Sequence, residues 1–598
     1  MGLCQFHSAS ALNYTLLSRN LSCRLVNLSS WLHFGHDRKL MRDVDMVGPI
    51  VDLDAPLERD TIVEVRHGKM KPMPGLTIES GIDKSIVDGP IWVSKTGIDG
   101  DEHDMTFHGG PTKAVHAYCS AHYPSWQTSH PSTAPRFTPG AFGENLVFVH
   151  LNERNVCIGD IFAVGPSAPS STSATLTLQV SQPRQPCFKL NHRFGLKNFA
   201  PETTRLSRTG WYFRVLEEGW VENGMEIRLV DRKYAEWTLE RLQGVLYRGA
   251  EGAAEMQFLL GVEELTDEIK GVVRRRLTKL EGATKKKEVL WTDWKVVDKV
   301  QQTRRITSFS FAAVHDKVDA TPEAGSHVKL RLPNGLVRAY SIVHGSRGRF
   351  ALGIARDENS RGGSKYLHEH VSVGDILQIG SITPGIKPNA MASNHVFIVA
   401  GIGITAFLWL VEEMVGVNWN VQVHYAVRSA EEMPFRTQLE KLGSRAVVYD
   451  KSKGERMDVE SVIKGMPWNS QVYVCGPRRL MDDAVKAAQD TGLGEKDVHF
   501  EAFGADVGGD PFEVVIRDKE DRTVLVTEEE TLLEVLQREF GDVVGSSCEV
   551  GNCGTCKVKL RCGKVDHRGT ALSAEEKESE MLSCVSRGVG KIEIEIGE

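Results

Sequence analysis

The sequence has 598 residues, of which 41% are apolar and 25% charged, and its formal net charge is −7. A chain of this length is too long to fold around a single hydrophobic core. At ~100–200 residues per domain, the length predicts about four domains. The acidic balance argues against nucleic acid as a polyanionic partner. Eleven cysteines are too few for a disulfide scaffold, so a reducing compartment fits the chain better.

Residues 1–60 are expected to form an N-terminal extension. The first 36 residues contain no acidic side chain, are rich in Ser and Leu, and carry Arg19 and Arg24, which is typical of a mitochondrial targeting segment. A disordered extension fits equally well because the stretch is poor in arginine, so the expected location is cytoplasmic or mitochondrial. The most apolar stretch, residues 396–411, is shorter than the ~18–20 residues that span a bilayer, so no membrane span is expected.

Residues 61–230 show short apolar segments separated by Gly and Pro turns, which predicts an all-β barrel. Four polar segments interrupt this pattern, at 97–118, 142–146, 179–195 and 207–219. Their His, Lys, Arg and Asn side chains beside turn glycines suit the binding of a phosphate and a heteroaromatic group. In this order the segments closely resemble the MOSC family, the molybdenum cofactor sulfurase C-terminal domain, and especially its bacterial branch linked to hydroxylaminopurine resistance.

The MOSC resemblance implies a molybdopterin site and places Cys187 there as the molybdenum ligand and catalytic residue; it leaves a pyridoxal phosphate-type MOSC domain open. A soft thiolate suits a metal that changes oxidation state, and Arg184 and Lys189 nearby are expected to lower the pKa of the thiol. A lone cysteine is more often a buried apolar residue, so the assignment depends on the neighbouring motifs. Without the resemblance, His108 and His116 could form a metal pair. The residues implied to bind molybdopterin are His108, Gly109, Gly110, Lys113, His116, Glu144, Asn145, Arg184, Lys189 and Arg208.

Residues 231–281 are predicted to be helical, because the apolar residues Leu265, Ile269, Val272, Val273, Leu277 and Leu280 follow helical spacing. The hydroxylaminopurine-resistance branch has a helical segment after its barrel, so the resemblance covers about 61–281. The basic run 285–287 that follows is interpreted as a linker that permits docking, and a plain solvated spacer is equally compatible.

Residues 286–388 are predicted to form a flavin-binding β-barrel. Within the strand-like segment 337–343, Arg338 and Tyr340 share one face, and Ser341 follows. There a guanidinium can hold a phosphate and a phenol can lie against a flavin ring. Taken singly, Tyr340 could equally be packed in the barrel core.

Residues 392–505 are predicted to form an α/β domain that binds NAD(P). The run 396–400 is typical of a buried parallel strand, and 401–406 is a G-x-G-x-x-A turn predicted to open a helix and admit a pyrophosphate. Two further predicted strands, 421–429 and 471–477, end at the same edge. Arg428 could meet the 2′-phosphate of NADPH or be a solvated charge, so NADH and NADPH both stay open. The residues predicted to bind NAD(P) are Gly401, Gly403, Thr405, Arg428, Cys475, Gly476 and Pro477.

Residues 511–598 carry the strongest motif, Cys548, Cys553 and Cys556 on a Gly-rich loop with Cys584 as a distant fourth ligand. This spacing is typical of a plant-type [2Fe-2S] cluster. A structural zinc site is the alternative, but zinc sites favour paired C-x2-C units and only one is present. The surrounding segments resemble a plant-type ferredoxin domain with a β-grasp fold.

The segments RAYS (338–341), 360–369, GIGIT (401–405), VCGP (474–477) and 500–504 together resemble the ferredoxin-reductase-like flavoproteins. Their order is that of the phthalate dioxygenase reductase family, over about 286–598. The resemblance implies FMN, with FAD also possible, a Gly-Gly-Ser segment near the flavin phosphate, and an aromatic residue beside the flavin. The related reductases mostly use NADH, so the hint of NADPH from Arg428 does not decide the coenzyme. The residues assigned to the flavin are Arg338, Tyr340, Ser341, Gly362, Gly363, Ser364 and Phe503.

Two functions follow from this multidomain reading. In the first, electrons pass from NAD(P)H through flavin and the [2Fe-2S] cluster to a molybdenum cofactor, which reduces N-hydroxylated small molecules such as hydroxylaminopurines, amidoximes and hydroxylamines to amines. In the second, the C-terminal half supplies electrons to a separate oxygenase, and the MOSC half is a sulfur carrier or binding module. The sequence leaves the oligomeric state open.

Overall fold

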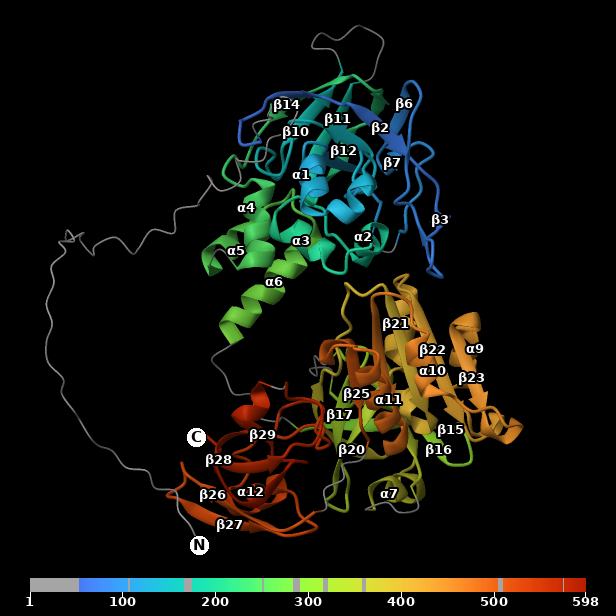
Figure 1. The fold of residues 1–598 in the computed structure, drawn as a ribbon, viewed down its shortest axis with the longest axis vertical. Helices are drawn as coiled ribbons and strands as arrows, with labels where there is room; N and C mark the ends of the chain where they lie inside the picture. The colour runs from blue at the N-terminus through green and yellow to red at the C-terminus, as the bar shows by residue number, and fades with distance from the viewer. Residues whose placement is uncertain are drawn as a thin grey trace, which may run out of the picture. The chain divides into compact units, whose positions relative to one another are not determined.

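A computed structural model describes residues 53–597, apart from 106–107, 166–174, 250–251, 283–290, 316–320, 358–361, 504–508 and 574. The expected targeting segment and the basic run 285–287 therefore lie outside the described residues. Figure 1 shows the described chain as four successive folded regions. No described helix combines the length and apolar character needed to cross a bilayer.

The first region is built on a nine-stranded sheet in the order β1-β14-β10-β11-β12-β8-β9-β2-β5. Neighbouring strands pair antiparallel except β8 and β9, which are parallel. Buried side chains from these strands form the core of the region, together with buried side chains from the helical segment that follows it. The strands are β1 (Arg59–Thr61), β2 (Glu64–His67), β5 (Ser85–Ile86), β8 (Val115–Cys119), β9 (Leu146–Phe148), β10 (Ile161–Val164), β11 (Leu176–Pro183), β12 (Trp211–Glu217) and β14 (Glu226–Asp231).

Smaller elements complete this region. A second sheet joins β13 to β6 and β7, and a short ribbon joins β3 to β4. These elements are β3 (Lys71–Pro72), β4 (Glu79–Ser80), β6 (Ile91–Ser94), β7 (Gly97–Ile98), β13 (Gly219–Val221), α1 (His122–Ser129), η1 (Pro131–Arg136), α2 (Phe188–Phe194) and α3 (Phe199–Arg205). The sheet begins at Arg59, two residues before the predicted start, because β1 pairs with β14.

The helical segment that follows packs against the same core. It comprises α4 (Leu239–Gln243), the π-helical turn η2 (Gly244–Arg248), α5 (Ala253–Gly261) and α6 (Asp267–Gly282). Leu265, Ile269, Val273 and Leu277 are buried in the cluster that contains the sheet residues, as the periodicity predicted. Leu280 is 56% exposed and does not belong to that face. Figure 1 shows these helices in green, beside the sheet to which they attach.

The second region is a closed barrel of six strands in the order β15-β16-β19-β18-β17-β20. Its interior holds Trp294, Phe309, Phe311 and Phe350, which explains why its strands alternate apolar and polar residues. The elements are β15 (Thr292–Gln301), β16 (Ile306–Ala313), β17 (His327–Arg331), β18 (Val337–Ser346), β19 (Arg349–Ala355), α7 (Gly363–His370) and β20 (Ile376–Thr383).

The third region is a parallel five-stranded sheet in the order β23-β22-β21-β24-β25. Numbered within the region, this is the doubly wound order 3-2-1-4-5, so the strand order reverses between β21 and β24. The strands are β21 (Asn394–Ala400), β22 (Val421–Val427), β23 (Ala446–Asp450), β24 (Ser470–Cys475) and β25 (Val498–Glu501). The connections carry η3 (Gly401–Ala406), α8 (Leu408–Gly416), η4 (Ala430–Glu432), α9 (Arg436–Lys441), η5 (Gly443–Arg445), η6 (Lys451–Lys453), α10 (Val459–Lys464), α11 (Arg478–Asp490) and η7 (Glu495–Asp497).

The fourth region is a mixed sheet in the order β27-β26-β30-β28-β29, crossed by one capped helix. Its helix α12 (Leu532–Phe540) begins in a capping box formed by Thr531 and Glu534. The other elements are β26 (Phe512–Ile516), β27 (Arg522–Val526), β28 (Lys557–Asp566), η8 (Glu576–Glu578), β29 (Glu580–Leu582) and β30 (Arg587–Glu595). The predicted multidomain fold class, from all-β domain to β-grasp, is confirmed.

Candidate functional site

A polar pocket opens on the first region where the predicted segments 97–118, 142–146 and 179–195 converge. Of the residues assigned to molybdopterin, seven line it together with Cys187: His108, Gly109, Lys113, His116, Asn145, Arg184 and Lys189. Chain segments that lie up to about 60 residues apart in the sequence thus meet at one place. The pocket also includes residues that the sequence analysis missed, namely Lys84, His103, Asp104, Phe142 and Tyr212.

The pocket is rich in cations, some of which are paired with buried carboxylates. Lys84 forms an ion pair with Asp101, and both side chains are almost fully buried. Lys189 Nζ lies 3.0 Å from Asp104 Oδ2. Asn145 holds this arrangement together, since its Nδ2 donates to Asp101 Oδ2 at 2.8 Å while its Oδ1 accepts from His116 N at 3.0 Å. Burial lowers the pKa of Lys84, and Asp101 partly offsets this effect.

Two buried nitrogen atoms at the pocket have no hydrogen-bond partner among the described residues: Arg184 Nη1 and His116 Nε2. Buried polar groups are normally satisfied, so such atoms indicate a place for a bound group. Burial, reinforced by Arg184, lowers the pKa of His108 to about 3 and that of His116 well below its ordinary value. Both imidazoles are therefore neutral, and the pocket suits a ligand that combines an anionic group with a hydrogen-bonding heterocycle.

Cys187 contributes a thiol to the pocket wall, and Tyr212 contributes a phenol. Cys187 is half-buried and immediately precedes α2, and its carbonyl oxygen accepts from Leu190 N at 3.0 Å. The hydroxyl of Tyr212, on β12, lies 3.0 Å from His108 Nδ1. Burial raises the pKa of Tyr212 to about 12, so its phenol keeps its proton at neutral pH.

Three residues assigned to molybdopterin lie outside the pocket lining: Gly110, Glu144 and Arg208. The buried Glu144 carboxylate instead accepts from Tyr123 Oη, Gly140 N and Phe142 N, so it shapes the loop that presents Phe142. Arg208 lies over the Trp126 ring and donates to Ser125 Oγ at 2.7 Å.

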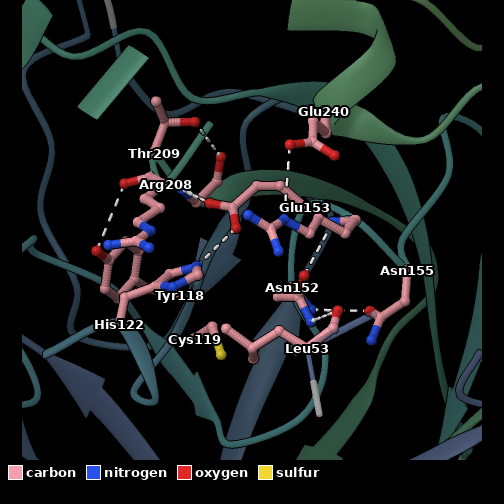
Figure 2. Close-up of polar contacts among 12 residues, drawn as sticks. Leu53, Tyr118, Cys119, His122, Asn152, Glu153, Asn155, Arg208, Thr209 and Glu240 are labelled. Carbon is pink, nitrogen blue, oxygen red and sulfur yellow. Dashed lines mark hydrogen bonds and ion pairs between the residues drawn. The ribbon is translucent and has the colours of Figure 1, made fainter. Parts of the chain in front are cut away.

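A second buried network lies behind the pocket and centres on Glu153. Figure 2 shows its carboxylate between His122 and the turn that carries Arg208 and Thr209. His122 Nε2 lies 2.9 Å from Glu153 Oε2, and Gly210 N donates to Glu153 Oε1 at 2.7 Å. Gly210 in turn accepts from Arg184 N and leads into β12, so Glu153 anchors the backbone that positions Arg184 and Tyr212.

In the six-stranded barrel, the structure brings Arg338 beside the Gly-Gly-Ser segment. A Cβ at Gly363 would lie 2.8 Å from Arg338 Cγ, and Gly362 has a φ of +91°, so only glycines allow this approach. Ser364 Oγ accepts from Asp357 N at 3.3 Å. The first turn of α7 and a guanidinium together suit a flavin phosphate.

The flavin-assigned residues beyond this cradle differ in exposure. Tyr340, near Arg338 on β18, is half-buried, and burial raises the pKa of Tyr340 to about 12. Ser341 pairs with His327 of β17. Phe503, assigned to the flavin by resemblance, is 45% exposed after β25.

The carboxyl edge of the parallel sheet brings the predicted NAD(P) motifs together. A Cβ at Gly403 would lie 2.4 Å from the carbonyl oxygen of Cys475, so the G-x-G-x-x-A turn and the Cys475–Pro477 turn touch. A Cβ at Gly476 would lie 2.7 Å from Leu480 Cδ2 and 3.2 Å from Ala400 Cβ, so this glycine also permits close packing. The G-x-G-x-x-A turn forms a 3-10 helix, η3, before the expected α-helix begins. Thr405 in this turn is 1% exposed, and its hydroxyl donates to Ile402 O and so closes the turn.

In the fourth region, the four cluster cysteines form two sulfur pairs. Cys556 Sγ lies 3.2 Å from Cys584 Sγ, and Cys548 N donates to Cys553 Sγ at 3.5 Å. Over the described residues, no three His, Cys, Asp or Glu side chains gather around one point as a single-metal site would require. Two pairs of thiolates instead suit a cluster with two irons, and Asn552 N adds a donor to Cys548 Sγ at 3.3 Å.

Three protein families match the chain. The MOSC domain family matches residues 104–228, the family described as "Dimethylamine monooxygenase subunit DmmA-like, N-terminal domain" matches 382–498, and the 2Fe-2S iron-sulfur cluster binding domain matches 515–588. The matches fall on the first, third and fourth regions. Both predicted resemblances are confirmed.

Similar proteins cover either the whole chain or its C-terminal half. A protein named Reductase from Gibberella moniliformis is 35% identical over 558 residues, which are 90% of this chain and 95% of the relative. The heme-dependent oxidative N-demethylase beta subunit of Ectopseudomonas mendocina is 35% identical and covers 48% of this chain and 92% of its own length. The phthalate 4,5-dioxygenase oxygenase reductase subunit of Pseudomonas putida is 32% identical and covers 50% of this chain and 94% of its own.

The long match and the three domain matches describe the same architecture. The C-terminal half is a flavin- and [2Fe-2S]-dependent NAD(P)H oxidoreductase, in agreement with the cradle, sheet edge and sulfur pairs described above. The chain therefore belongs to the family of the fungal Reductase and joins a MOSC domain to a phthalate dioxygenase reductase-like flavoprotein region and a 2Fe-2S ferredoxin domain.

Proposed function

We propose that this chain is a self-contained molybdenum-dependent reductase of N-hydroxylated small molecules. The balanced reaction is R-NH-OH + NAD(P)H + H⁺ → R-NH2 + H2O + NAD(P)⁺, in which the N–O bond breaks and two electrons come from the nicotinamide. Hydroxylaminopurines, amidoximes and hydroxylamines are the substrate classes. One polypeptide would keep the electron donor and the acceptor site at high effective concentration.

The observation that carries the proposal is the pocket with Cys187 at its wall. Its free nitrogen atoms, Arg184 Nη1 and His116 Nε2, lie beside a half-buried thiol. This donor set fits a pterin that bears a phosphate and a thiolate-ligated metal. A binding module alone would not require a half-buried thiol between buried cations.

The proposal gives roles to three cations, the thiol and the phenol of the pocket. Arg184, Lys113 and Lys189 would hold the anionic part of the molybdenum cofactor, and Cys187 would ligate the metal. When bound, the cofactor supplies a metal centre that accepts the hydroxyl oxygen of the substrate. The leaving oxygen needs a proton, and the Tyr212 phenol holds one at the pocket wall, beside the neutral His108.

A second candidate function is electron supply to a separate oxygenase. It is favoured by the printed names of the relatives of the C-terminal half, which include reductase subunits of a phthalate dioxygenase and of carnitine monooxygenases. In that case the MOSC domain would be a sulfur carrier or binding module.

Replacing Cys187 by serine separates the two functions. The proposal predicts that the C187S variant loses NAD(P)H-dependent reduction of a hydroxylamine or amidoxime but keeps its reduction of cytochrome c. Cys562→Ser is the matched control, because Cys562 is an exposed thiol of the ferredoxin domain outside the cluster pairs. Substrate reduction that survives in C187S would overturn the molybdenum proposal and leave the oxygenase reductase.

A further inference from the structure

Reduction of an N–O bond consumes protons inside the MOSC pocket. The half-reaction at the substrate is R-NH-OH + 2 e⁻ + 2 H⁺ → R-NH2 + H2O, so the nitrogen and the leaving oxygen each take one proton. Electrons that travel through a [2Fe-2S] cluster bring no protons with them. Two protons must therefore reach the pocket from solvent in each turnover, and the Tyr212 phenol accounts for one of them.

Most polar groups of the pocket are unsuited to supply the second proton. Burial holds the pKa of His108 at about 3 and that of His116 well below its ordinary value, so neither imidazole is protonated at neutral pH. The proposed function already uses three of the lining cations to hold an anion, namely Arg184, Lys113 and Lys189. Among the described lysines and arginines that line the pocket, Lys84 is the one without a role in that function.

Lys84 is held at the pocket wall by a buried ion pair. Its side chain is 3% exposed, and that of its partner Asp101 is 0% exposed. The Asp101 carboxylate is fixed in turn, because Oδ1 accepts from Gly68 N at 2.8 Å and Oδ2 accepts from Asn145 Nδ2 at 2.8 Å. Burial lowers the pKa of Lys84, although Asp101 partly offsets this effect, and an amine whose pKa lies closer to neutral exchanges its proton more readily.

His103 connects this ion pair to the surface. Its Nε2 lies 3.4 Å from Asp101 Oδ2, whereas Lys84 meets the other oxygen of the same carboxylate. The His103 side chain is 16% exposed and also lines the pocket. A Cβ at Gly109 would lie 2.9 Å from His103 Cδ2, and Gly109 has a φ of +76°, so a glycine at this position lets the ring approach. The three side chains thus form a continuous path of ionisable groups to the pocket wall.

We propose that Lys84 is the second proton donor of this reduction, an assignment that rests on the proposed function, with Asp101 as its positioning residue and His103 as the group that returns a proton from solvent. As the N–O bond breaks, the Lys84 ammonium gives a proton to the nitrogen and the Tyr212 phenol gives one to the leaving oxygen. Lys84 then remains as a neutral amine beside Asp101. A proton from solvent restores the ammonium before the next turnover.

The first test measures molybdenum content, kcat and KM for hydroxylamine reduction in the full-length holoprotein. Lys84→Arg keeps a cation beside Asp101, but a guanidinium does not release its proton. Its kcat should fall about 10²-fold, the lower end of general acid catalysis, with KM and molybdenum content unchanged. His103→Gln should lower kcat by a smaller factor. Lys71→Met is the matched control, because Lys71 and Asp83 form an exposed ion pair in the same region, and it should change none of the three values.

A double variant guards against a failure to fold. Lys84→Met alone would leave the Asp101 carboxylate buried and unpaired, which is strongly destabilising. Lys84→Met combined with Asp101→Asn removes both charges. The double variant should bind molybdenum and show the same loss of kcat as Lys84→Arg.

A labelling measurement follows the proton on Lys84 without turnover. Reductive methylation of the full-length protein by formaldehyde, analysed by mass spectrometry, should reach half its maximal rate at a lower pH for Lys84 than for free Nα-acetyllysine. The midpoint reports the protonation equilibrium and not the speed with which the reagent enters. The charged and titratable groups that act on Lys84 or contact it are Asp101, Glu144, His103, His116 and Arg66.

Four outcomes would overturn the inference. Wild-type kcat in Lys84→Arg would show that a fixed charge suffices, and loss of molybdenum in both Lys84 variants would show that Lys84 holds the cofactor. A labelling midpoint equal to that of Nα-acetyllysine would remove the readily exchanged proton, and unchanged kcat in His103→Gln would remove the path from solvent. All four leave the proposed function standing as long as C187S loses substrate reduction. A wild-type protein that reduces no N-hydroxylated compound would overturn the proposed function and this inference together.

Discussion

Removal of the Glu153 carboxylate should loosen the backbone behind the pocket. With the carboxylate ionised, Gly210 N and His122 Nε2 are its two buried donors. Glu153→Ala leaves both unpaired and breaks a buried ion pair, which costs about 3–5 kcal/mol. Glu153→Gln retains one acceptor oxygen and so leaves one donor unpaired, at a cost of about 1–3 kcal/mol.

Hydrogen–deuterium exchange of the full chain measures this loss of local stability through the peptide that covers residues 207–214. At 1.4 kcal/mol per tenfold, the peptide should exchange about 10² to 4 × 10³ times faster in Glu153→Ala than in the wild type, and Glu153→Gln should lie between them. Glu202→Ala is the matched control, because the Glu202–His130 pair has the same chemistry at 3.0 Å but is partly exposed, and so is worth about 1 kcal/mol or less. Equal exchange in Glu153→Ala and Glu202→Ala would refute the role of Glu153.

The same network predicts a pH dependence. Burial would raise the pKa of Glu153, but the attraction and hydrogen bond of His122, together with backbone hydrogen bonds that include the one from Gly210, outweigh burial and hold this pKa below its ordinary value of 4.5. A depressed carboxyl pKa contributes stability that is complete above pH 4.5 and is lost as the pH falls through the pKa of the folded state. Protection of residues 207–214 should therefore fall below pH 4.5 in the wild type, and this fall should be absent in Glu153→Ala.

Two further substitutions test the reductase half. Cys556→Ser removes one member of a sulfur pair and should abolish the visible absorbance of the [2Fe-2S] cluster, while flavin reduction by NAD(P)H survives. Cys562→Ser is the control and should leave the spectrum unchanged. An intact cluster in C556S would contradict the ligand assignment. Gly403→Ala forces a Cβ to 2.4 Å from the Cys475 carbonyl oxygen, a strain of about 1–3 kcal/mol that should raise KM for NAD(P)H about tenfold. Gly416→Ala on α8 meets no atom within 4 Å and should leave KM unchanged, so equal effects of the two would refute the close turn contact.

The sequence predicts the elements whose signal is local. Strand β11 (Leu176–Pro183) shows turn-bounded β-formers, β21 (Asn394–Ala400) is a continuous apolar run, and α12 (Leu532–Phe540) carries a capping box. Cysteine spacing likewise indicates a two-iron cluster because its loop ligands lie within nine residues. In each case a short stretch contains the physical cause of the structure.

The pocket depends on distant residues and was predicted less completely. Lys84 enters it through an ion pair with Asp101, and no local pattern around Lys84 marks it. Tyr212 lies within a segment that was singled out, 207–219, but strand alternation alone does not identify the pocket face. Glu144 was assigned to the cofactor by the MOSC resemblance, whereas its hydrogen bonds to Tyr123 Oη and Gly140 N form only after folding.

The central claim is that the MOSC pocket holds molybdenum in a chain that supplies its own electrons. The most direct measurement is elemental analysis of the purified full-length protein, with iron as the internal standard for the cluster. The proposal predicts about one molybdenum and two irons per chain, and a loss of molybdenum but not of iron in Cys187→Ser. Two irons without molybdenum, in protein produced by cells that synthesise the cofactor, would contradict the claim.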